Sequence, residues 1–258
     1  MTYYLDTSAH LERHGGAPDV QAAIAGLLGD ETHASSSHAE REWKRIVHGC
    51  ASDILNVLQV ESSLQGVRAR LRQGFDRVVT QRWLVYDMLI DGDDCTVEEL
   101  AHRARRHIRT GFHAMFNDRV DVRDGSQCAI ARRAASPDEA GKWRYPGTCK
   151  KSESICDQVA FLRSQQPRVL TAAQALQHNA SRDADKELGR KTEQRMRLAD
   201  TELKGQNCYA GKGVGGDIAI ALECAPDEIL LTSDESFEHI CPALGLNHHR
   251  LTGTRMPA

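Results

Sequence analysis

The sequence predicts an α/β fold with a central, mainly parallel sheet flanked by helices, because short apolar strands alternate with helical segments at both ends of the chain. The expected strands are Tyr3–Leu5, the weaker Thr32–Ser36, Glu228–Leu231 and a last short strand at Asn247–Leu251. Apolar residues at helical spacing follow each of the first three. Strands joined through a helix usually lie parallel, so these segments favour one sheet.

The composition is that of an ordinary globular protein. The chain has 258 residues, of which 40% are hydrophobic and 27% are charged, so it can form a core and is not globally disordered. Its 33 basic and 36 acidic side chains exclude nucleic-acid binding by bulk charge alone, and any such site must be a local patch. No apolar run approaches the roughly 18 residues of a membrane helix. Residues 1–6 lack the basic start and apolar stretch of a signal peptide, so we expect a cytoplasmic protein without a membrane segment.

The middle of the chain has a different texture. Helical spacing recurs there at 55–71, 75–90, 97–116, 155–162 and 172–203. Residues 121–154 are polar and contain several Gly and Pro, which predicts a loop or irregular structure. We therefore expect a discontinuous core made of 1–50 and 206–258. A long, mostly helical insertion at 51–205 would interrupt it, with the first part of the insertion completing the core helices.

Acidic residues stand where a parallel sheet places its active site. Asp6 and Asp234 each follow an expected strand, and Asp217 opens a helix. A fourth acid, Glu42 or its neighbour Glu40, lies early on the helix after the second strand. Carboxylates gathered at one edge of a sheet repel one another unless a cation neutralises them, and Mg²⁺ and Mn²⁺ prefer such oxygen ligands. The alternative is that each acid only caps a turn or a helix.

In these segments the sequence resembles the PIN-domain nuclease family. The matching pieces follow the family's order: Tyr4–Ser8, Ser35-Ser36 followed by Glu42-Trp43, Gly216–Ala221, and Ile229–Phe237 with Leu244–Leu246 closing it. No single piece is specific for this family, but the occurrence of all of them in the family's order is. The resemblance covers the two ends of the chain and not most of the middle. It implies a PIN-like three-layer fold that carries a family-specific insertion.

The resemblance also implies residue roles. The metal-binding acids would be Asp6, Glu42, Asp217 and Asp234. Glu42 is preferred over Glu40 because the family's Glu precedes a hydrophobic residue, here Trp43. Ser8 and Thr232 would support the site by hydrogen bonds to the acids or to a bound water.

The function implied by the resemblance is that of a Mg²⁺- or Mn²⁺-dependent endoribonuclease. It would hydrolyse single-stranded or loop RNA and leave a 3′-hydroxyl and a 5′-phosphate. The sequence is equally compatible with three biological roles: a toxin of a toxin–antitoxin pair, a defence nuclease and an RNA-processing enzyme. It is also compatible with an antitoxin or another protein as a partner, and with a homodimer. A DNA nuclease is not excluded by the acids. The second alternative is a non-catalytic PIN-like scaffold that carries a zinc-stapled module for binding nucleic acid or protein.

The eight cysteines form two groups. We expect four in apolar segments to be reduced core residues: Cys50, Cys95, Cys224 and Cys241. The other four lie among polar and Gly-rich residues: Cys128, Cys149, Cys156 and Cys208. Four thiolates could close a tetrahedral structural zinc site, with Cys95 or His178 as a substitute ligand. The spacing is not that of Cys-x-x-Cys pairs, so four unrelated thiols are the alternative.

Positive charge gathers in the middle segment. Arg105, Arg106 and Arg109 lie on one expected helix, and Lys150 and Lys151 follow in the polar stretch. The functional interpretation is a phosphate-binding surface positioned over the acids, since an acidic pocket cannot attract an anionic substrate alone. The alternative is a solvated helix face.

Two further motifs predict no site. His10 and His14 have metal-ligand spacing on a helix, but Gly15 and Gly16 should break any helix there, which predicts surface histidines. The glycines of 211–216 match a dinucleotide-binding pattern formally. No hydrophobic strand precedes them, so we expect a loop.

Overall fold

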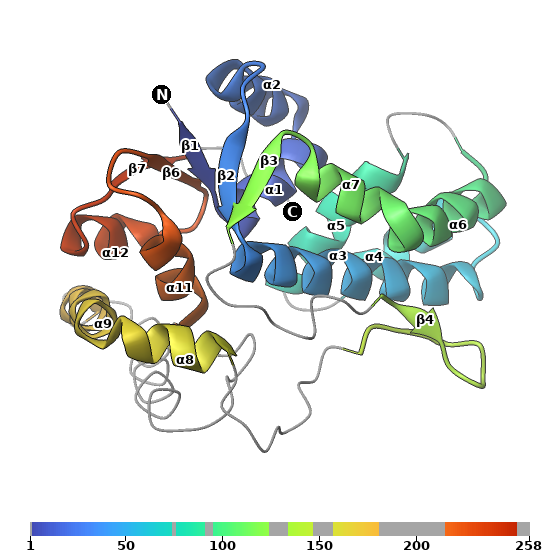
Figure 1. The fold of residues 1–258 in the computed structure, drawn as a ribbon. Helices are drawn as coiled ribbons and strands as arrows, with labels where there is room; N and C mark the ends of the chain where they lie inside the picture. The colour runs from blue at the N-terminus through green and yellow to red at the C-terminus, as the bar shows by residue number, and fades with distance from the viewer. Residues whose placement is uncertain are drawn as a thin grey trace.

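A five-stranded parallel sheet forms the centre of the molecule (Figure 1). The computed structural model describes residues 2–73, 76–90, 95–123, 134–146, 157–180 and 215–251. The strands are β1 (Tyr3–Leu5), β2 (His33–Ser36), β3 (Val120–Arg123), β6 (Ile229–Thr232) and β7 (Asn247–Arg250). They lie in the order β3-β2-β1-β6-β7, and every neighbouring pair is parallel. The predicted α/β class and parallel sheet are confirmed.

Helices cover both faces of this sheet. Leu5 and Leu231 pair in the register of β1 and β6 and form an apolar cluster with α1 (Thr7–Gly15) and α2 (Pro18–Leu28). Tyr4 and Leu230 alternate with them and join the larger core on the other face. That core includes residues of α11 (Gly215–Glu223) and α12 (Phe237–Ala243). The result is a helix–sheet–helix arrangement in three layers.

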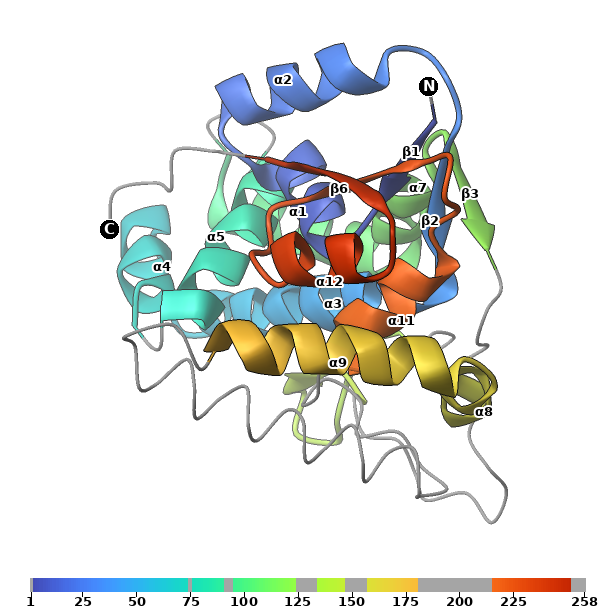
Figure 2. The ribbon, with the colours of Figure 1, turned by 90° about the vertical axis from the view of Figure 1, so that its left-hand side faces the viewer.

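Two further helices lie outside α11 and α12. They are α8 (Asp157–Ser164) and α9 (Gln166–Ala180), and Figure 2 shows α9 running along the outer side of α11 and α12. The longest of the described helices, α3 (Ser37–Leu58), begins directly after β2. Its N-terminus is capped by the Ser36 hydroxyl, which accepts from the Ala39 amide at 2.9 Å. None of the described helices is long and apolar enough to cross a membrane.

The helices expected in the first part of the middle segment are present. They are α4 (Leu64–Leu71), α5 (Asp76–Ile90), α6 (Val97–Arg106), a π-helical turn η1 (His107–Gly111) and α7 (Phe112–Asn117). Residues 121–154, which were expected to be a loop or irregular structure, contain strands in both of their described parts, 121–123 and 134–146. The first residues belong to β3, which pairs with β2, and a short antiparallel pair follows at β4 (Ser136–Pro137) and β5 (Trp143–Arg144). One edge of the sheet is therefore built by residues inside the range expected to be an insertion.

The expectation of surface histidines is wrong. α1 continues through His14 to Gly15, and His10 is completely buried. Its ring stacks on Phe116 with 4.1 Å between ring centroids, and the His14 ring meets the edge of Trp43. Gly15 ends the helix at a close contact of α1 with α5, since a Cβ there would lie 2.3 Å from a backbone oxygen of α5. The four cysteines expected in the core, Cys50, Cys95, Cys224 and Cys241, are buried.

Candidate active site at the carboxyl edge of the sheet

The strand order creates a switch point between β1 and β6. The chain proceeds from β1 to β2 and β3 on one side of the sheet, and later to β6 and β7 on the other. In open α/β sheets, ligands bind outside the carboxyl ends of the strands at such a reversal. Asp6 directly follows β1, and Asp234 lies two residues beyond the end of β6. The two acids that the sequence predicted thus flank the switch point.

Asp6 is the most enclosed of these acids. Its side chain caps α1 and accepts hydrogen bonds from the Ala9 amide, the Ser8 hydroxyl and the Thr232 hydroxyl, each at 2.8 Å. Burial raises the pKa of Asp6 to about 7, against the lowering effect of these hydrogen bonds, and the charge of Asp234 adds to the rise. Ion pairs among the described residues do not include Asp6. Its carboxylate is therefore balanced there only by neutral donors.

Hydroxyl groups connect three of the acids in a chain. Thr232 Oγ1 donates to Asp6 and accepts from the Asp234 amide at 2.9 Å. The Ser236 amide donates to Asp234 Oδ1 at 2.9 Å, and the Ser236 hydroxyl donates to Asp217 Oδ2 at 3.1 Å. The chain runs from the end of β1, across β6, to the first turn of α11. It fixes carboxylates that are far apart in the sequence relative to one another.

The two glutamates on α3 point to different neighbours. Glu42 Oε2 accepts from the Thr7 hydroxyl at 3.1 Å, and Thr7 is the residue next to Asp6. Its other oxygen pairs with Arg45. Glu40 instead pairs with Lys44 at 2.5 Å and lies 3.6 Å from His113 on α7. Glu42 therefore lies beside the start of α1, whereas Glu40 belongs to the contact between α3 and α7.

Some contributors to this edge were missed from the sequence. Ser236 and Thr7 orient acids, and their only signal is that a hydroxyl residue stands within two positions of an aspartate. His38 and Arg41 are buried on the first turns of α3, with Arg41 Nη2 3.0 Å from His38 Nε2. A Cβ on Gly216 would lie 2.9 Å from that nitrogen, so the glycine beside Asp217 lets α11 approach α3. A buried arginine therefore lies near the start of α11.

The donors at this edge suit a hard cation. Carboxylate and hydroxyl oxygens are the ligands that Mg²⁺ and Mn²⁺ prefer. A nearby cation favours the charged form of a buried carboxyl such as Asp6, whose pKa burial has raised. Among the described residues, no three His, Cys, Asp or Glu side chains are grouped closely enough to surround a metal ion. Asp6, Asp217 and Asp234 are linked through hydroxyls, and Glu42 joins them only through Thr7.

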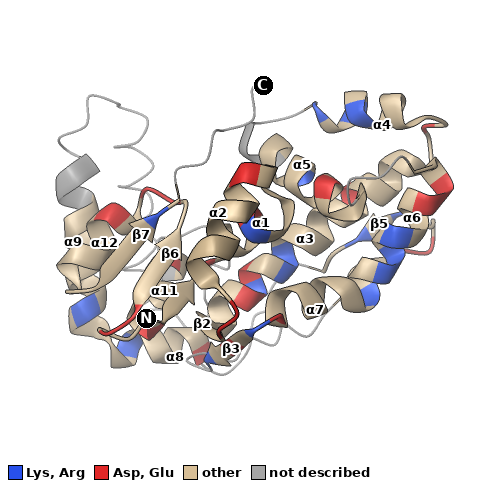
Figure 3. Ribbon diagram, turned by 90° about the horizontal axis from the view of Figure 1, so that it is seen from above, with Lys and Arg blue, Asp and Glu red and all other residues tan. Residues whose placement is uncertain are grey.

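The basic helix is not brought to the acids. Arg105, Arg106 and Arg109 are exposed, and Figure 3 shows the basic residues of α6 at the end of the molecule away from the five-stranded sheet. The helical stretch runs back along α3 until His113 reaches Glu40. Arg105 lies eight residues earlier, roughly 12 Å along the helix axis.

The remaining predicted residues lie outside the described parts of the chain. These are the zinc candidates Cys128, Cys149, Cys156 and Cys208, the basic pair Lys150 and Lys151, and the first glycines of 211–216. Of the two substitute zinc ligands, Cys95 is buried, and the side chain of His178 is also outside the description.

Comparisons of the chain with protein-family models, with curated proteins and with solved structures find no match.

Proposed function

We propose that this chain is a divalent-metal-dependent phosphodiesterase, an endoribonuclease with a PIN-like core, that acts through Asp6, Glu42, Asp217 and Asp234. The observation that carries the proposal is the pair formed by Asp6 and Asp234. They follow adjacent parallel strands at the switch point of the sheet, and the Thr232 hydroxyl joins them. That is where open α/β sheets bind ligands, and two carboxylates there are costly without a cation.

The acids would hold Mg²⁺ or Mn²⁺. When bound, such an ion activates a water molecule for attack on phosphorus and stabilises the leaving oxygen. Thr232 and Ser236 keep the carboxylates oriented through their hydrogen bonds, and Ser8 adds a second hydroxyl at Asp6. The preference for RNA over DNA, and the 3′-hydroxyl and 5′-phosphate products, come from the resemblance to PIN-domain nucleases.

Glu42 is our choice for the fourth acid. Its contact with Thr7 keeps it beside α1, one residue from Asp6, and its partner Arg45 is half-exposed. Glu40 is engaged by Lys44 and His113 on another side of α3. The two glutamates therefore offer a matched pair of variants on one helix, with the same charge removed from each.

A cleavage assay tests the proposal. Mixed RNA and DNA are incubated with Mn²⁺ and wild type, Asp6→Asn, Asp234→Asn, Glu42→Gln or Glu40→Gln protein. We expect wild type to cleave RNA and EDTA to abolish this cleavage. Asp6→Asn, Asp234→Asn and Glu42→Gln should each lower the cleavage rate by more than about 100-fold, which exceeds the loss expected for a residue that only orients a metal ligand. Glu40→Gln should retain cleavage. Cleavage that survives both EDTA and Asp6→Asn would refute the proposal, and circular dichroism of each variant separates lost chemistry from lost folding.

A further inference from the structure

A second site lies far from the acids, where the helical stretch from α6 to α7 changes its winding. The π-helical turn at His107–Gly111 widens the helix, and such turns occur frequently at functional sites. His107 Nδ1 lies 2.9 Å from the Arg103 carbonyl oxygen, which accepts its hydrogen bond. A Cβ on Gly111 would lie 2.6 Å from the His107 ring, so the glycine makes room for that ring. The local sequence therefore fixes the position of one histidine at the bend.

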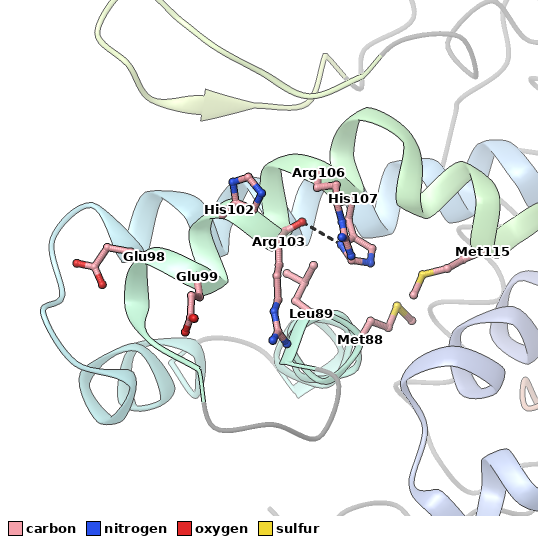
Figure 4. A pocket seen from close by; sticks show the side chains of 9 residues that line it. All are labelled: Met88, Leu89, Glu98, Glu99, His102, Arg103, Arg106, His107 and Met115. Atoms are coloured by element: carbon pink, nitrogen blue, oxygen red, sulfur yellow. Dashed lines mark hydrogen bonds between the residues drawn. The ribbon is translucent and has the colours of Figure 1, made fainter.

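This histidine lines an open pocket between α5 and α6 (Figure 4). The pocket has a volume of about 560 Å³, within the roughly 300–1,000 Å³ of small-molecule sites. Its apolar lining residues are Met88, Leu89 and Met115, of which Met88 and Leu89 are buried and Met115 is partly exposed. Arg103 and His107 point toward α5 from the helical stretch α6–η1, which Arg106 also belongs to. Guanidinium groups and a thioether side chain thus line one cavity.

In the part of the chain that the structure describes, the acid that interacts with these arginines is Glu99, whose pKa is lowered by its hydrogen bonds with Thr96 and also by the charge of Arg103. Among the described residues, ion pairs do not include Arg103, Arg105, Arg106 or Arg109, although other described arginines do form them, such as those to Asp118, Asp53 and Glu228. Like charges spaced three or four apart on a helix repel one another. The acids at the pocket's end do not relieve this repulsion fully, because Glu99 accepts from the Thr96 amide in a capping box. An anion bound between the guanidinium groups would.

We propose that this pocket binds a nucleoside phosphate, with the phosphate on Arg103 and Arg106 and the base against Met115, the partly exposed apolar residue of its lining. A guanidinium group has five donors in a planar fork that matches phosphate oxygens. Arg103 donates one of its hydrogen bonds to the Ile90 carbonyl, which holds it in place and leaves further donors for a ligand. A bare phosphate would use only the arginines. Met115 adds the preference for an attached base.

The pocket is separate from the acids. Met88 lies against Gly15 at the C-terminal end of α1, whereas Asp6 caps the N-terminal end. α1 has nine residues, so the two sites are roughly 13 Å apart along it. A nucleotide in the pocket does not reach Asp6, and its binding is independent of the proposed cleavage. The ligand could be a free nucleotide or the phosphorylated end of an RNA strand.

Calorimetric titration in EDTA, which prevents metal-dependent cleavage, tests the proposal with AMP, adenosine and inorganic phosphate as probes. AMP should bind saturably, and about tenfold tighter than either fragment. Arg106→Gln should weaken AMP binding by about tenfold or more, because one charge-assisted contact is lost. Arg105→Gln is the matched control, since Arg105 is the exposed neighbour that does not line the pocket, and its effect should stay under about twofold.

Three outcomes would overturn the proposal. They are no saturable binding up to about 10 mM AMP, phosphate binding as tight as AMP binding, or equal losses for Arg105→Gln and Arg106→Gln. Competition with an RNA tetramer identifies the source of the ligand. Displacement of AMP by the 5′-phosphorylated tetramer but not by the 5′-hydroxyl tetramer supports a strand end, and the absence of displacement supports a free nucleotide.

Discussion

Thr232 Oγ1 donates a hydrogen bond to Asp6 Oδ2 at 2.8 Å, although 226 positions separate the two residues. The contact follows from the parallel pairing of β1 with β6, in which Leu5 is opposite Leu231. Asp6 and Thr232 are the next residues after Leu5 and Leu231, so the carboxylate and the hydroxyl lie within hydrogen-bonding distance. The same hydroxyl accepts from the Asp234 amide, so it joins the two acids at the switch point.

We expect Asp6→Asn to stabilise the protein at neutral and higher pH. The pKa of Asp6 is about 7 in the folded protein and about 3.8 in the unfolded chain, so the folded state holds its proton more tightly. That contribution to stability is fully present below about pH 4 and is lost as pH rises through 7. At about pH 8 the variant should unfold with a free energy roughly 1–3 kcal/mol higher than wild type, and the gain should shrink at about pH 5.

Urea unfolding of both proteins at the two pH values, in EDTA, measures this difference. A variant that is less stable than wild type at both pH values would contradict the account of Asp6 as an uncompensated buried carboxyl. Cleavage is measured on the same preparations, so that a loss of activity in a more stable protein is assigned to chemistry.

Thr232→Val should weaken both the fold and the proposed reaction. The substitution keeps the shape of the side chain, but removes the donor to Asp6 and the acceptor of the Asp234 amide. Asp6 keeps the Ala9 and Ser8 donors, but the Asp234 amide loses its acceptor, and leaving such a group unpaired costs about 1–3 kcal/mol. Activity should fall by roughly 10–100-fold, as for other residues that orient metal ligands. Thr232→Ser keeps the hydroxyl and should keep most of the activity; if it loses as much as Thr232→Val, the hydroxyl is not the relevant group.

The central strands and their acids were predictable because their signals are local. β1 and β6 are short apolar runs, and Asp6 and Asp234 follow them within two residues. β3 was missed because Val120–Arg123 has only two apolar residues, at alternate positions, and it is stabilised by distant partners. Its last residue, Arg123, forms a two-pronged ion pair with Glu228, 105 positions away. This ion pair allows a charged residue to end a strand at the sheet edge. The residues around Arg123 in the sequence do not predict the pair.

The contacts of the acids and the place of the basic helix depend on packing over long distances. The sequence puts Ser236 near Asp234, but its bond to Asp217 exists because α11 and the start of α12 meet. The amphipathic spacing of α6 predicted the helix correctly, but it does not determine which end of α3 this helix packs against. Likewise, the sequence predicted that Gly15 would break the helix, because its close contact with α5 exists only in the tertiary structure.

Gly15→Ala should destabilise the protein strongly, whereas Gly26→Ala should stabilise it. A Cβ at Gly15 would lie 2.3 Å from the Leu84 carbonyl oxygen, so α1 and α5 must separate, at a cost of about 1–3 kcal/mol or more. Gly26 lies inside α2 with nothing within 4 Å of a new Cβ, and alanine there gains up to about 1 kcal/mol of helix propensity. Thermal unfolding of both variants provides the comparison. Equal melting temperatures would show that α1 and α5 tolerate separation.

His10 should make the protein sensitive to mild acid. Burial lowers the pKa of His10 well below its usual value, and the charges of His14 and Arg13 lower it further. Below about pH 6.5 the unfolded chain therefore binds a proton at this residue that the folded state does not, and stability falls by up to about 1.4 kcal/mol per pH unit. His10→Gln removes this titration, so its unfolding free energy should decrease less than that of wild type between about pH 7 and pH 5.

The comparison requires a control for the substitution itself, because His10 also stacks on Phe116 and contacts the Ser35 hydroxyl, and glutamine loses the stack. That loss lowers stability equally at both pH values, so only the difference between the two pH values reports the titration. His249→Gln makes the same change at an exposed position of β7 and should leave the stability unchanged at both. If His10→Gln lost as much stability on acidification as wild type, the acid sensitivity would have to arise from the other buried histidines, of which His38 and His48 also have lowered pKa values through burial.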